Sequence, residues 1–249
     1  MASQNPKTAI ITGGSRGIGK AAALLLAENG YNICISYNKN RDKALEVIKQ
    51  AQKHQVKAIA VKADLSVESQ IMEMFNQIDN ELGTLSALVN NAAISGGIKA
   101  IEDIDFQYLE NIYKTNVFST FICCREAIKR MKTAKIQGSI VNISSLSAKN
   151  GGFKMSAYAS SKAAVNNLTI GLAKEAAEYN IRINAVSPGV IDTDTHSNIS
   201  NERRQHLNNS IALKRMGQPE EVAQLILWLL SDKASYITGS ILPITGGKS

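Results

Sequence analysis

The sequence has few of the residues that build disulfide frameworks or metal sites. Its 249 residues include three cysteines and three histidines. Cys123 and Cys124 are adjacent, Cys34 lies far from them, and the histidines are widely spaced. An odd number of cysteines without CxxC spacing argues against both disulfides and a zinc site. We therefore expect reduced, buried thiols and no protein metal site.

Long apolar runs and aromatic residues are also scarce. No apolar run approaches the roughly 18 residues of a membrane-spanning helix, and aromatic residues make up 5% of the chain. The first seven residues contain no apolar signal-peptide core. With 44% hydrophobic and 20% charged residues, the composition is that of a globular protein rather than a disordered chain. We expect a cytoplasmic protein with no membrane partner.

Positive charge exceeds negative charge, with 28 Lys and Arg against 21 Asp and Glu, a net charge of +7. Such an excess could bind a nucleic acid or an anionic cofactor, or it could make the surface basic without binding either. The densest basic group, Lys129, Arg130, Lys132 and Lys135, alternates with apolar residues. It lacks the interleaved aromatics that stack on single-stranded bases. We expect no nucleic-acid partner.

Short apolar runs alternate with helical patterns along the whole chain. Runs of this kind indicate buried strands of a parallel sheet that helices cover on both faces. No repeat or composition break divides the chain, so we predict one domain over 1–249. Its fold class is α/β, a Rossmann-type, doubly wound parallel sheet flanked by helices. The expected strands are 8–12, 32–36, 57–62, 85–90, 138–144, 182–186 and 240–243, and the expected helices are 18–29, 42–54, 66–82, 116–132, 157–178 and one starting at Pro219.

A glycine-rich segment joins the first expected strand to the first expected helix. It spans 12–19 and reads TGGSRGIG. Glycines there allow a tight turn, close approach of a pyrophosphate and close packing of helix on strand. Glycines also suit an ordinary turn, but the position between strand and helix favours a phosphate site. The expected contacts are Gly13, Ser15, Arg16, Gly17, Ile18 and Gly19.

The spacing of these glycines resembles the short-chain dehydrogenase/reductase family. The segments Asn90-Asn91-Ala92-Ala93, Ser144-Ser145, Tyr158-x-x-x-Lys162 and Pro188-Gly189 follow in the family's order and approximate spacing. The resemblance covers essentially the whole chain, with Ala93 where glycine is usual. It implies a nicotinamide-dependent oxidoreductase acting on a carbonyl or alcohol. Within the family, the chain resembles bacterial glucose or sugar dehydrogenases and 3-oxoacyl-carrier-protein reductases.

Tyr158 and Lys162 are the expected reacting pair, because residues four apart on a helix project from one face. A neighbouring ammonium, with oxidised nicotinamide, lowers the pKa of a phenol, so Tyr158 could exchange a proton with the substrate oxygen. Ser145, favoured over Ser144, is expected to hold that oxygen. The resemblance makes Asn116 the fourth catalytic residue, which holds a water that links the lysine to solvent. Asn116 could also cap a helix.

The residues after the second expected strand favour NADP(H) over NAD(H). NAD-binding proteins typically place an acid there, whereas this chain has Asn38 and Lys39. Arg16 and Lys39 could pair with a 2′-phosphate, or both could be solvated surface cations. Asp64 resembles an adenine contact, or it is an acid at a helix start. The resemblance extends the cofactor contacts to Leu65, Asn91, Ala92, Tyr158, Lys162, Pro188, Gly189, Ile191 and Thr193.

The polar stretch 190–217 is expected to determine the substrate. It is long enough for a mobile lid, and it could also be a solvated surface loop. Its polar residues suit a sugar or another small hydroxylated compound: Asp194, His196, Asn198, Arg203, Arg204 and His206.

The sequence leaves open two alternative functions and the oligomeric state. A 3-oxoacyl-carrier-protein reductase could dock its acidic carrier on the basic group at 129–135. A dinucleotide-binding sensor without turnover could use the same fold, although it would need no proton relay. The resemblance also implies a homotetramer packed through the helices near 116–132 and 157–178, whose small residues would equally suit an ordinary core.

Overall fold

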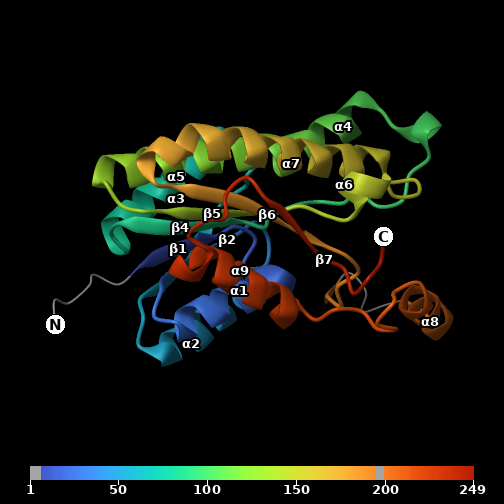
Figure 1. Ribbon diagram of the computed structural model, residues 1–249, viewed down its shortest axis with the longest axis horizontal. Coiled ribbons are helices and arrows are strands. Elements are labelled where there is room, and N and C mark those ends of the chain that lie inside the picture. The colour runs from blue at the N-terminus through green and yellow to red at the C-terminus, as the bar shows by residue number, and fades with distance from the viewer. Residues whose placement is uncertain (1–6, 195–198) are drawn as a thin grey trace.

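The computed structural model describes residues 7–194 and 199–249. Within them, seven parallel strands form one sheet in the order β3-β2-β1-β4-β5-β6-β7 (Figure 1). The chain order reverses between β1 and β4, which is the switch point of a doubly wound sheet. The predicted Rossmann-type fold is confirmed. The strands are β1 (Thr8–Ile11), β2 (Asn32–Tyr37), β3 (Ala58–Lys62), β4 (Leu85–Asn90), β5 (Ser139–Ile143), β6 (Arg182–Pro188) and β7 (Ile241–Ile244).

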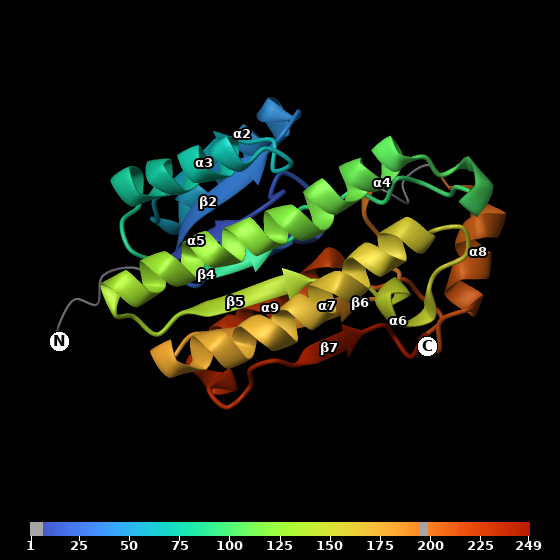
Figure 2. The ribbon, with the colours of Figure 1, turned by 90° about the horizontal axis from the view of Figure 1, so that it is seen from above.

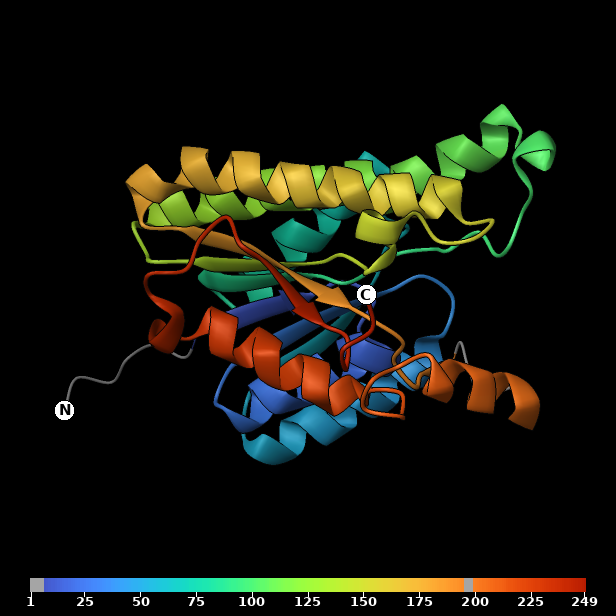
Figure 3. The ribbon, with the colours of Figure 1, turned by 45° about the vertical axis from the view of Figure 1, so that its right-hand side comes forward.

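Two layers of helices cover the sheet (Figures 1 and 3). On one face lie α1 (Gly17–Glu28), α2 (Arg41–Ala51) and α9 (Pro219–Leu230), and on the other lie α3 (Glu68–Glu81), α5 (Ser119–Ala134) and α7 (Ser156–Ala176). Side chains alternate along each strand, so Ala9 and Ile11 enter one core and Ile10 enters the other. Because both faces are covered, β1, β2 and β5 are buried throughout. Their sequences are therefore mainly apolar without alternation.

The helix expected at 116–132 begins earlier than the sequence indicates. The short helix α4 (Phe106–Tyr113) runs through a π-helical turn, η3 (Lys114–Phe118), directly into α5. Asn116 lies inside this turn, so the alternative that it caps a helix is wrong. Single π-helical turns are rare and often occur at functional sites.

A helix also lies within the polar stretch 190–217, where none was expected. Helix α8 (Asn201–Asn209) has no buried residue. Its sequence has no apolar stripe, which is the pattern by which a helix is recognised from sequence. Ser200 caps it by accepting a hydrogen bond from the Arg203 backbone N–H over 3.2 Å. Arg204 pairs with Asp192 over 2.9 Å and ties the helix to the segment after β6. His196 and Asn198, which were expected to help bind substrate, lie outside the described residues.

The carboxyl ends of the strands meet at one edge of the sheet, as parallel pairing requires. Helices α4, α8 and α6 (Ser147–Asn150) gather at this edge (Figure 2). The carboxyl-terminal half of α5, with the basic group at 129–135, lies at the opposite edge (Figure 2). No helix among the described residues is long and apolar enough to cross a membrane.

Candidate active site and dinucleotide cleft

Hydrogen bonds to β2 and β4 hold the glycine-rich loop between β1 and α1. The backbone N–H groups of Gly13 and Gly14 donate to the hydroxyl and the carbonyl of Ser36, each over 3.1 Å. From the other side, the Asn91 amide donates to the carbonyls of Thr12 and Gly13 over 2.9 and 3.1 Å. Neither Ser36 nor Thr12 was expected from the sequence to hold this loop.

The loop needs its glycines for both conformation and packing. Gly13 and Gly17 have φ angles of +64° and +52°, which disfavour residues with a Cβ. A Cβ on Gly14 would lie 2.4 Å from Ile35, and one on Gly19 would lie 2.5 Å from the Gly13 carbonyl. Backbone N–H groups at the start of α1 are thereby left close to the surface of a cleft. This arrangement fits a pyrophosphate, which binds backbone N–H groups at helix starts.

A cleft of about 540 Å³ lies along this loop at the carboxyl edge of the sheet. Most residues expected to contact the cofactor line it. These are Gly13, Ser15, Arg16, Gly17, Ile18, Asn38, Lys39, Asp64, Leu65, Asn91, Ala92 and Thr193. Others expected there do not line it: Gly19 is buried under the loop, Ile191 is buried in the core, and Pro188 ends β6. Tyr158, Lys162 and Gly189 also lie outside its lining.

Charged groups of both signs line the cleft. Arg16 and Lys39 are exposed. Asp64 accepts hydrogen bonds from the Ser66 N–H and hydroxyl over 2.9 and 2.7 Å, which lower the pKa of Asp64, with smaller effects from Asn38 and Lys39. Helix α3 begins at Glu68, so Asp64 lies in the turn before the helix and does not cap it. Asp64 also lines the cleft.

Helix α7 brings Tyr158 and Lys162 to the carboxyl end of β5. The Lys162 ammonium is buried and donates to the carbonyl of Ile143 over 2.7 Å, and burial lowers the pKa of Lys162 to about 8. Burial raises the pKa of Tyr158, while its hydrogen bond with Ser145 lowers it. The expected lowering by Lys162 is not found in the chain alone, where burial dominates and the ammonium lies 5.9 Å from the ring centroid. Any net lowering of the Tyr158 pKa must therefore come from positive charge that a bound cofactor adds.

The structure separates the two adjacent serines. Ser144 is buried, and its hydroxyl donates to the backbone carbonyl of Lys162 over 3.3 Å. Ser145 is half-buried, hydrogen-bonds Tyr158 and lines a second pocket. Its hydroxyl also accepts from the Ser147 N–H over 3.1 Å, which orients it. Ser145, and not Ser144, is therefore placed to meet a substrate oxygen.

Asn116 connects three segments at the same edge of the sheet. Its side-chain oxygen accepts from the Ile94 N–H over 2.8 Å, and its amide donates to the Ile94 carbonyl over 2.9 Å. The amide also donates to the hydroxyl of Ser161 on α7 over 3.0 Å. The side chain thus fixes the irregular segment after β4 against the helix that carries Tyr158 and Lys162. The π-helical turn gives this fully buried side chain its position.

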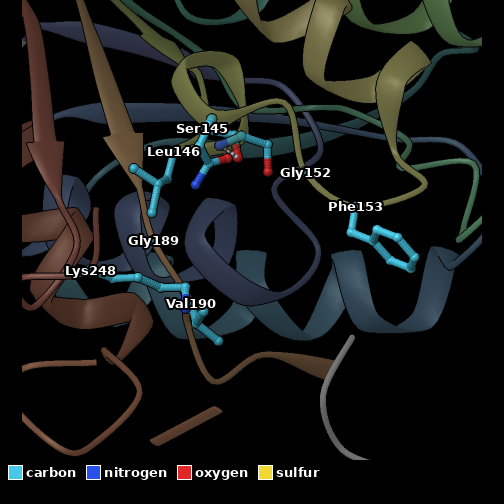
Figure 4. Close-up of a pocket in the computed structure, with 9 residues that line it drawn as sticks. Ser145, Leu146, Gly152, Phe153, Gly189, Val190 and Lys248 are labelled. Atoms are coloured by element: carbon cyan, nitrogen blue, oxygen red, sulfur yellow. Dashed lines mark hydrogen bonds between the residues drawn. The ribbon is translucent and has the colours of Figure 1, made fainter. Parts of the chain in front are cut away.

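The second pocket, of about 370 Å³, adjoins Ser145 (Figure 4). Figure 4 shows Lys248 and Phe153 on opposite sides of this pocket. Neither residue was expected at the site from the sequence. Phe153 lies in an irregular segment before α7, and Lys248 lies in the tail after β7, where no strand or helix period marks a functional side chain.

The basic group at 129–135 is largely paired with neighbouring side chains. Arg130 contacts Asp79 and the buried Glu126, each over 2.9 Å, and Lys129 contacts Glu126 over 3.3 Å. Lys132 donates to the Tyr179 hydroxyl over 2.8 Å. A carrier docked there would face the edge of the sheet opposite the pocket beside Ser145.

Comparison with known proteins identifies the family. A sequence profile of the family described as Enoyl-(Acyl carrier protein) reductase matches residues 13–249. The chain belongs to the short-chain dehydrogenase/reductase family. The resemblance stated from the motifs is thus confirmed, and this short-chain dehydrogenase/reductase is an oxidoreductase of a family that binds a nicotinamide dinucleotide.

Individual relatives cover nearly the whole chain. The oxidoreductase YgfF of Escherichia coli is 44% identical over 244 residues, 96% of this chain and 99% of its own. The 3-oxoacyl-[acyl-carrier-protein] reductase FabG of Staphylococcus epidermidis is 33% identical over 241 residues, 97% of this chain and 98% of its own. The crystal structure of acetoin dehydrogenase YohF from Salmonella typhimurium superposes with a TM-score of 0.88 at 34% identity, over 97% of this chain and 96% of YohF.

Proposed function

We propose that this protein is an NADP(H)-dependent oxidoreductase that interconverts a carbonyl and a secondary alcohol, with Tyr158 as general acid and base. One observation carries the proposal: the Tyr158 phenol, the Ser145 hydroxyl that lowers its pKa and the buried ammonium of Lys162 meet at the carboxyl end of β5. The proposal treats 1–249 as a single cofactor-binding and catalytic domain in the cytoplasm. The stretch 190–217 acts as the substrate loop.

The residues of the chain supply positioning and proton transfer. The bound nicotinamide supplies or accepts the hydride. In reduction the Tyr158 hydroxyl gives its proton to the carbonyl oxygen, and in oxidation it takes one from the alcohol. Ser145 donates to the same oxygen and orients it, while the Lys162 ammonium would favour the phenolate on Tyr158 only together with the added positive charge of an oxidised nicotinamide. Asn116 holds the surrounding segments and keeps a path from Lys162 to solvent.

The preference for NADP(H) rests on the cations of the cleft. Arg16 follows the glycine loop and Lys39 follows β2, and both are exposed where they line the cleft. No carboxylate follows β2 at Asn38 or Asn40 to accept a ribose hydroxyl. Guanidinium and ammonium groups at these positions favour a 2′-phosphate.

The substrate is a small carbonyl or hydroxylated compound, for which a sugar or hydroxyketone is one candidate, and the likeness to an acetoin dehydrogenase structure supports this size. A 3-oxoacyl thioester is the second candidate, supported by the 33% identity with FabG. The position of the basic group at 129–135, at the edge opposite the pocket, argues against delivery from a carrier docked there. A sensor without turnover is disfavoured because it has no use for a buried lysine.

The assembly we propose is a homotetramer packed through α5 and α7. Large apolar side chains are exposed on these helices and on the π-helical turn: Phe118 and Phe121 are 52% and 53% exposed, and Ile170 is 37% exposed. Apolar groups of this size on neighbouring helices are typical of an interface. Light scattering should give four times the chain mass of 26.9 kDa, and a monomeric mass would refute the tetramer.

The test is a binding titration with NADPH, NADP⁺, NADH and NAD⁺ at one fixed salt concentration, followed by turnover assays with small ketones. Selective binding of the phosphorylated pair together with ketone reduction supports the proposal. Selective binding of NAD(H) would overturn the NADP(H) preference, while failure to bind any of the four would overturn the enzymatic assignment as a whole.

A further inference from the structure

The pocket beside Ser145 is built from three segments that are distant in sequence. Residues 145–153 form one wall, Gly189 and Val190 after β6 form another, and Lys248 of the C-terminal tail closes a third side (Figure 4). Leu146, Phe153 and Val190 make much of the lining apolar. Phe153 is 84% exposed, so its ring is available to cover a ligand.

Lys248 is the one charged residue that lines this pocket within the described part of the chain, and no Asp or Glu side chain there accompanies it. A positive charge next to an apolar wall attracts a negatively charged group, and no Asp or Glu side chain among the described lining residues competes for it. A neutral sugar gains nothing from such a charge beyond an ordinary hydrogen bond.

Contacts with the substrate loop hold Lys248 in place. Its ammonium donates to the Ser210 hydroxyl, just after α8, over 2.6 Å. The tail is further fixed by the Leu213 N–H, which donates to the Gly246 carbonyl over 3.0 Å. An ammonium has three N–H donors, and the described residues supply a hydrogen-bond acceptor for one of them. The others are available to a ligand in the pocket.

We propose that Lys248 binds a carboxylate of the substrate, so that the enzyme acts on small oxo acids and the corresponding hydroxy acids. This inference rests on the proposed function, because it places the reacting carbonyl at Ser145 and Tyr158 and the carboxylate at Lys248. One ammonium matches one negative charge, which favours a carboxylate over a doubly charged phosphate. Phe153 and Val190 then cover the carbon chain between the two ends.

Other cations near the pocket do not line it. Lys154 lies 5.6 Å from the ring centroid of Phe153, on which it stacks, and Lys149 is exposed on α6 next to the lining residue Asn150. Lys149 therefore offers a matched control, since its removal takes away one nearby positive charge without changing the lining. Replacement of Lys248 by arginine keeps the charge at the pocket.

The experiment compares substrates that differ by one negative charge. With NADPH, kcat/KM is measured for acetoacetate and 4-oxopentanoate and for their neutral methyl esters, with acetoacetyl-CoA as a thioester. The enzymes are the native protein, Lys248→Met, Lys248→Arg and Lys149→Met. Binding of the matching hydroxy acids and their esters, measured by saturation-transfer NMR, repeats the comparison without turnover. Thermal unfolding and NADPH titration confirm that each variant is folded.

We expect the native enzyme to prefer at least one acid over its ester. A hydrogen bond to a charged group is worth enough that Lys248→Met should lower this preference about tenfold or more. Lys248→Arg should retain most of the preference, and Lys149→Met should retain all of it. An unchanged preference in Lys248→Met, or a native preference for the esters or the thioester, would overturn the inference. If the acids bind through Lys248 but no ketone is reduced, the proposed function fails and the binding site stands.

Discussion

The Lys162 ammonium on α7 donates a hydrogen bond over 2.7 Å to the carbonyl of Ile143, the last residue of β5. This contact joins the helix that carries Tyr158 to the strand that leads to Ser145. Lys162 as a whole is 3% exposed, and burying a charge costs folding free energy unless it is well paired. The hydrogen bond to one backbone carbonyl offsets this cost only in part. A buried charge that lowers stability in this way is typical of a functional group.

The pH dependence of stability should reveal this buried ammonium. Burial lowers the pKa of Lys162 to about 8 from its ordinary 10.5, so between these values the unfolded chain binds more protons than the folded one. The contribution of Lys162 to stability must therefore increase as pH rises through this window, by up to about 3 kcal/mol.

Urea unfolding of the native protein and of Lys162→Met, at one protein concentration, measures this contribution. The difference between the two free energies of unfolding should increase in favour of the native protein from about pH 8 to about pH 10.5. Burial raises the pKa of the Cys34 and Cys123 thiols, so these groups make stability fall as the pH rises. Both proteins contain these thiols, so their contribution cancels in the difference. A difference that stays flat or declines would show that Lys162 does not titrate as argued.

Removal of the cleft cations should alter cofactor preference. Loss of a charged hydrogen bond to a phosphate typically costs enough to change affinity roughly tenfold. We expect Arg16→Ala and Lys39→Ala each to lower the preference for NADPH over NADH by about this factor. Lys20→Ala is the control, because Lys20 lies on α1, pairs with Glu46 over 3.8 Å and does not line the cleft. Titration by cofactor fluorescence measures both affinities, and an equal loss for NADPH and NADH would argue against a 2′-phosphate contact.

Replacement of Asn116 should damage both stability and turnover. Asn116→Ala removes three hydrogen bonds, two with the backbone of Ile94 and one with the hydroxyl of Ser161, each worth about 0.5–1.5 kcal/mol. We expect a lower unfolding free energy and a lower kcat. Thr115→Ala, beside it on the same turn, controls for a change in that turn. Native stability in Asn116→Ala would mean that water replaces all three contacts.

An ion pair at the rim of the cleft should slow cofactor release. Lys43 on α2 lies 3.0 Å from Asp194, which follows Thr193 and lines the cleft. Both side chains are about half exposed, so the pair is worth at most about 1 kcal/mol and Lys43→Gln should speed NADPH dissociation less than about fivefold. Lys49→Gln on the same helix is the control. Stopped-flow displacement measures the rate, and the effect should vanish at high salt. A persistent effect at high salt would point to a cause other than this ion pair.

Much of the sheet could be predicted because covered parallel strands are short, continuous and apolar. The strand at 32–36 and the helix at 18–29 were predicted to within a residue or so of β2 and α1. The failures have physical causes. Helix α8 is polar on nearly all sides and shows no apolar stripe. Helix α4 has apolar residues at helical spacing, Phe106, Leu109 and Ile112, but it is only eight residues long and buries Ile112 alone. The π-helical turn depends on packing around Asn116, which no local pattern encodes.

The candidate site was predictable where motif spacing carries the information, as for Tyr158 and Lys162. Contacts that depend on the folded arrangement were not. The sequence could not show that Ser144 turns toward a backbone carbonyl while Ser145 meets Tyr158. It also could not show that Lys248, more than a hundred positions from Ser145, lines the same pocket.

The most direct test of the central claim compares the native enzyme with Tyr158→Phe, using one reducible ketone at saturating NADPH. Loss of a positioned acid typically lowers turnover by about a hundredfold or more, whereas NADPH affinity, which rests on the cleft, should change little. We expect kcat to fall by at least this factor while the NADPH dissociation constant stays within about twofold. Turnover within about tenfold of the native rate would contradict the assignment of Tyr158 as the proton donor.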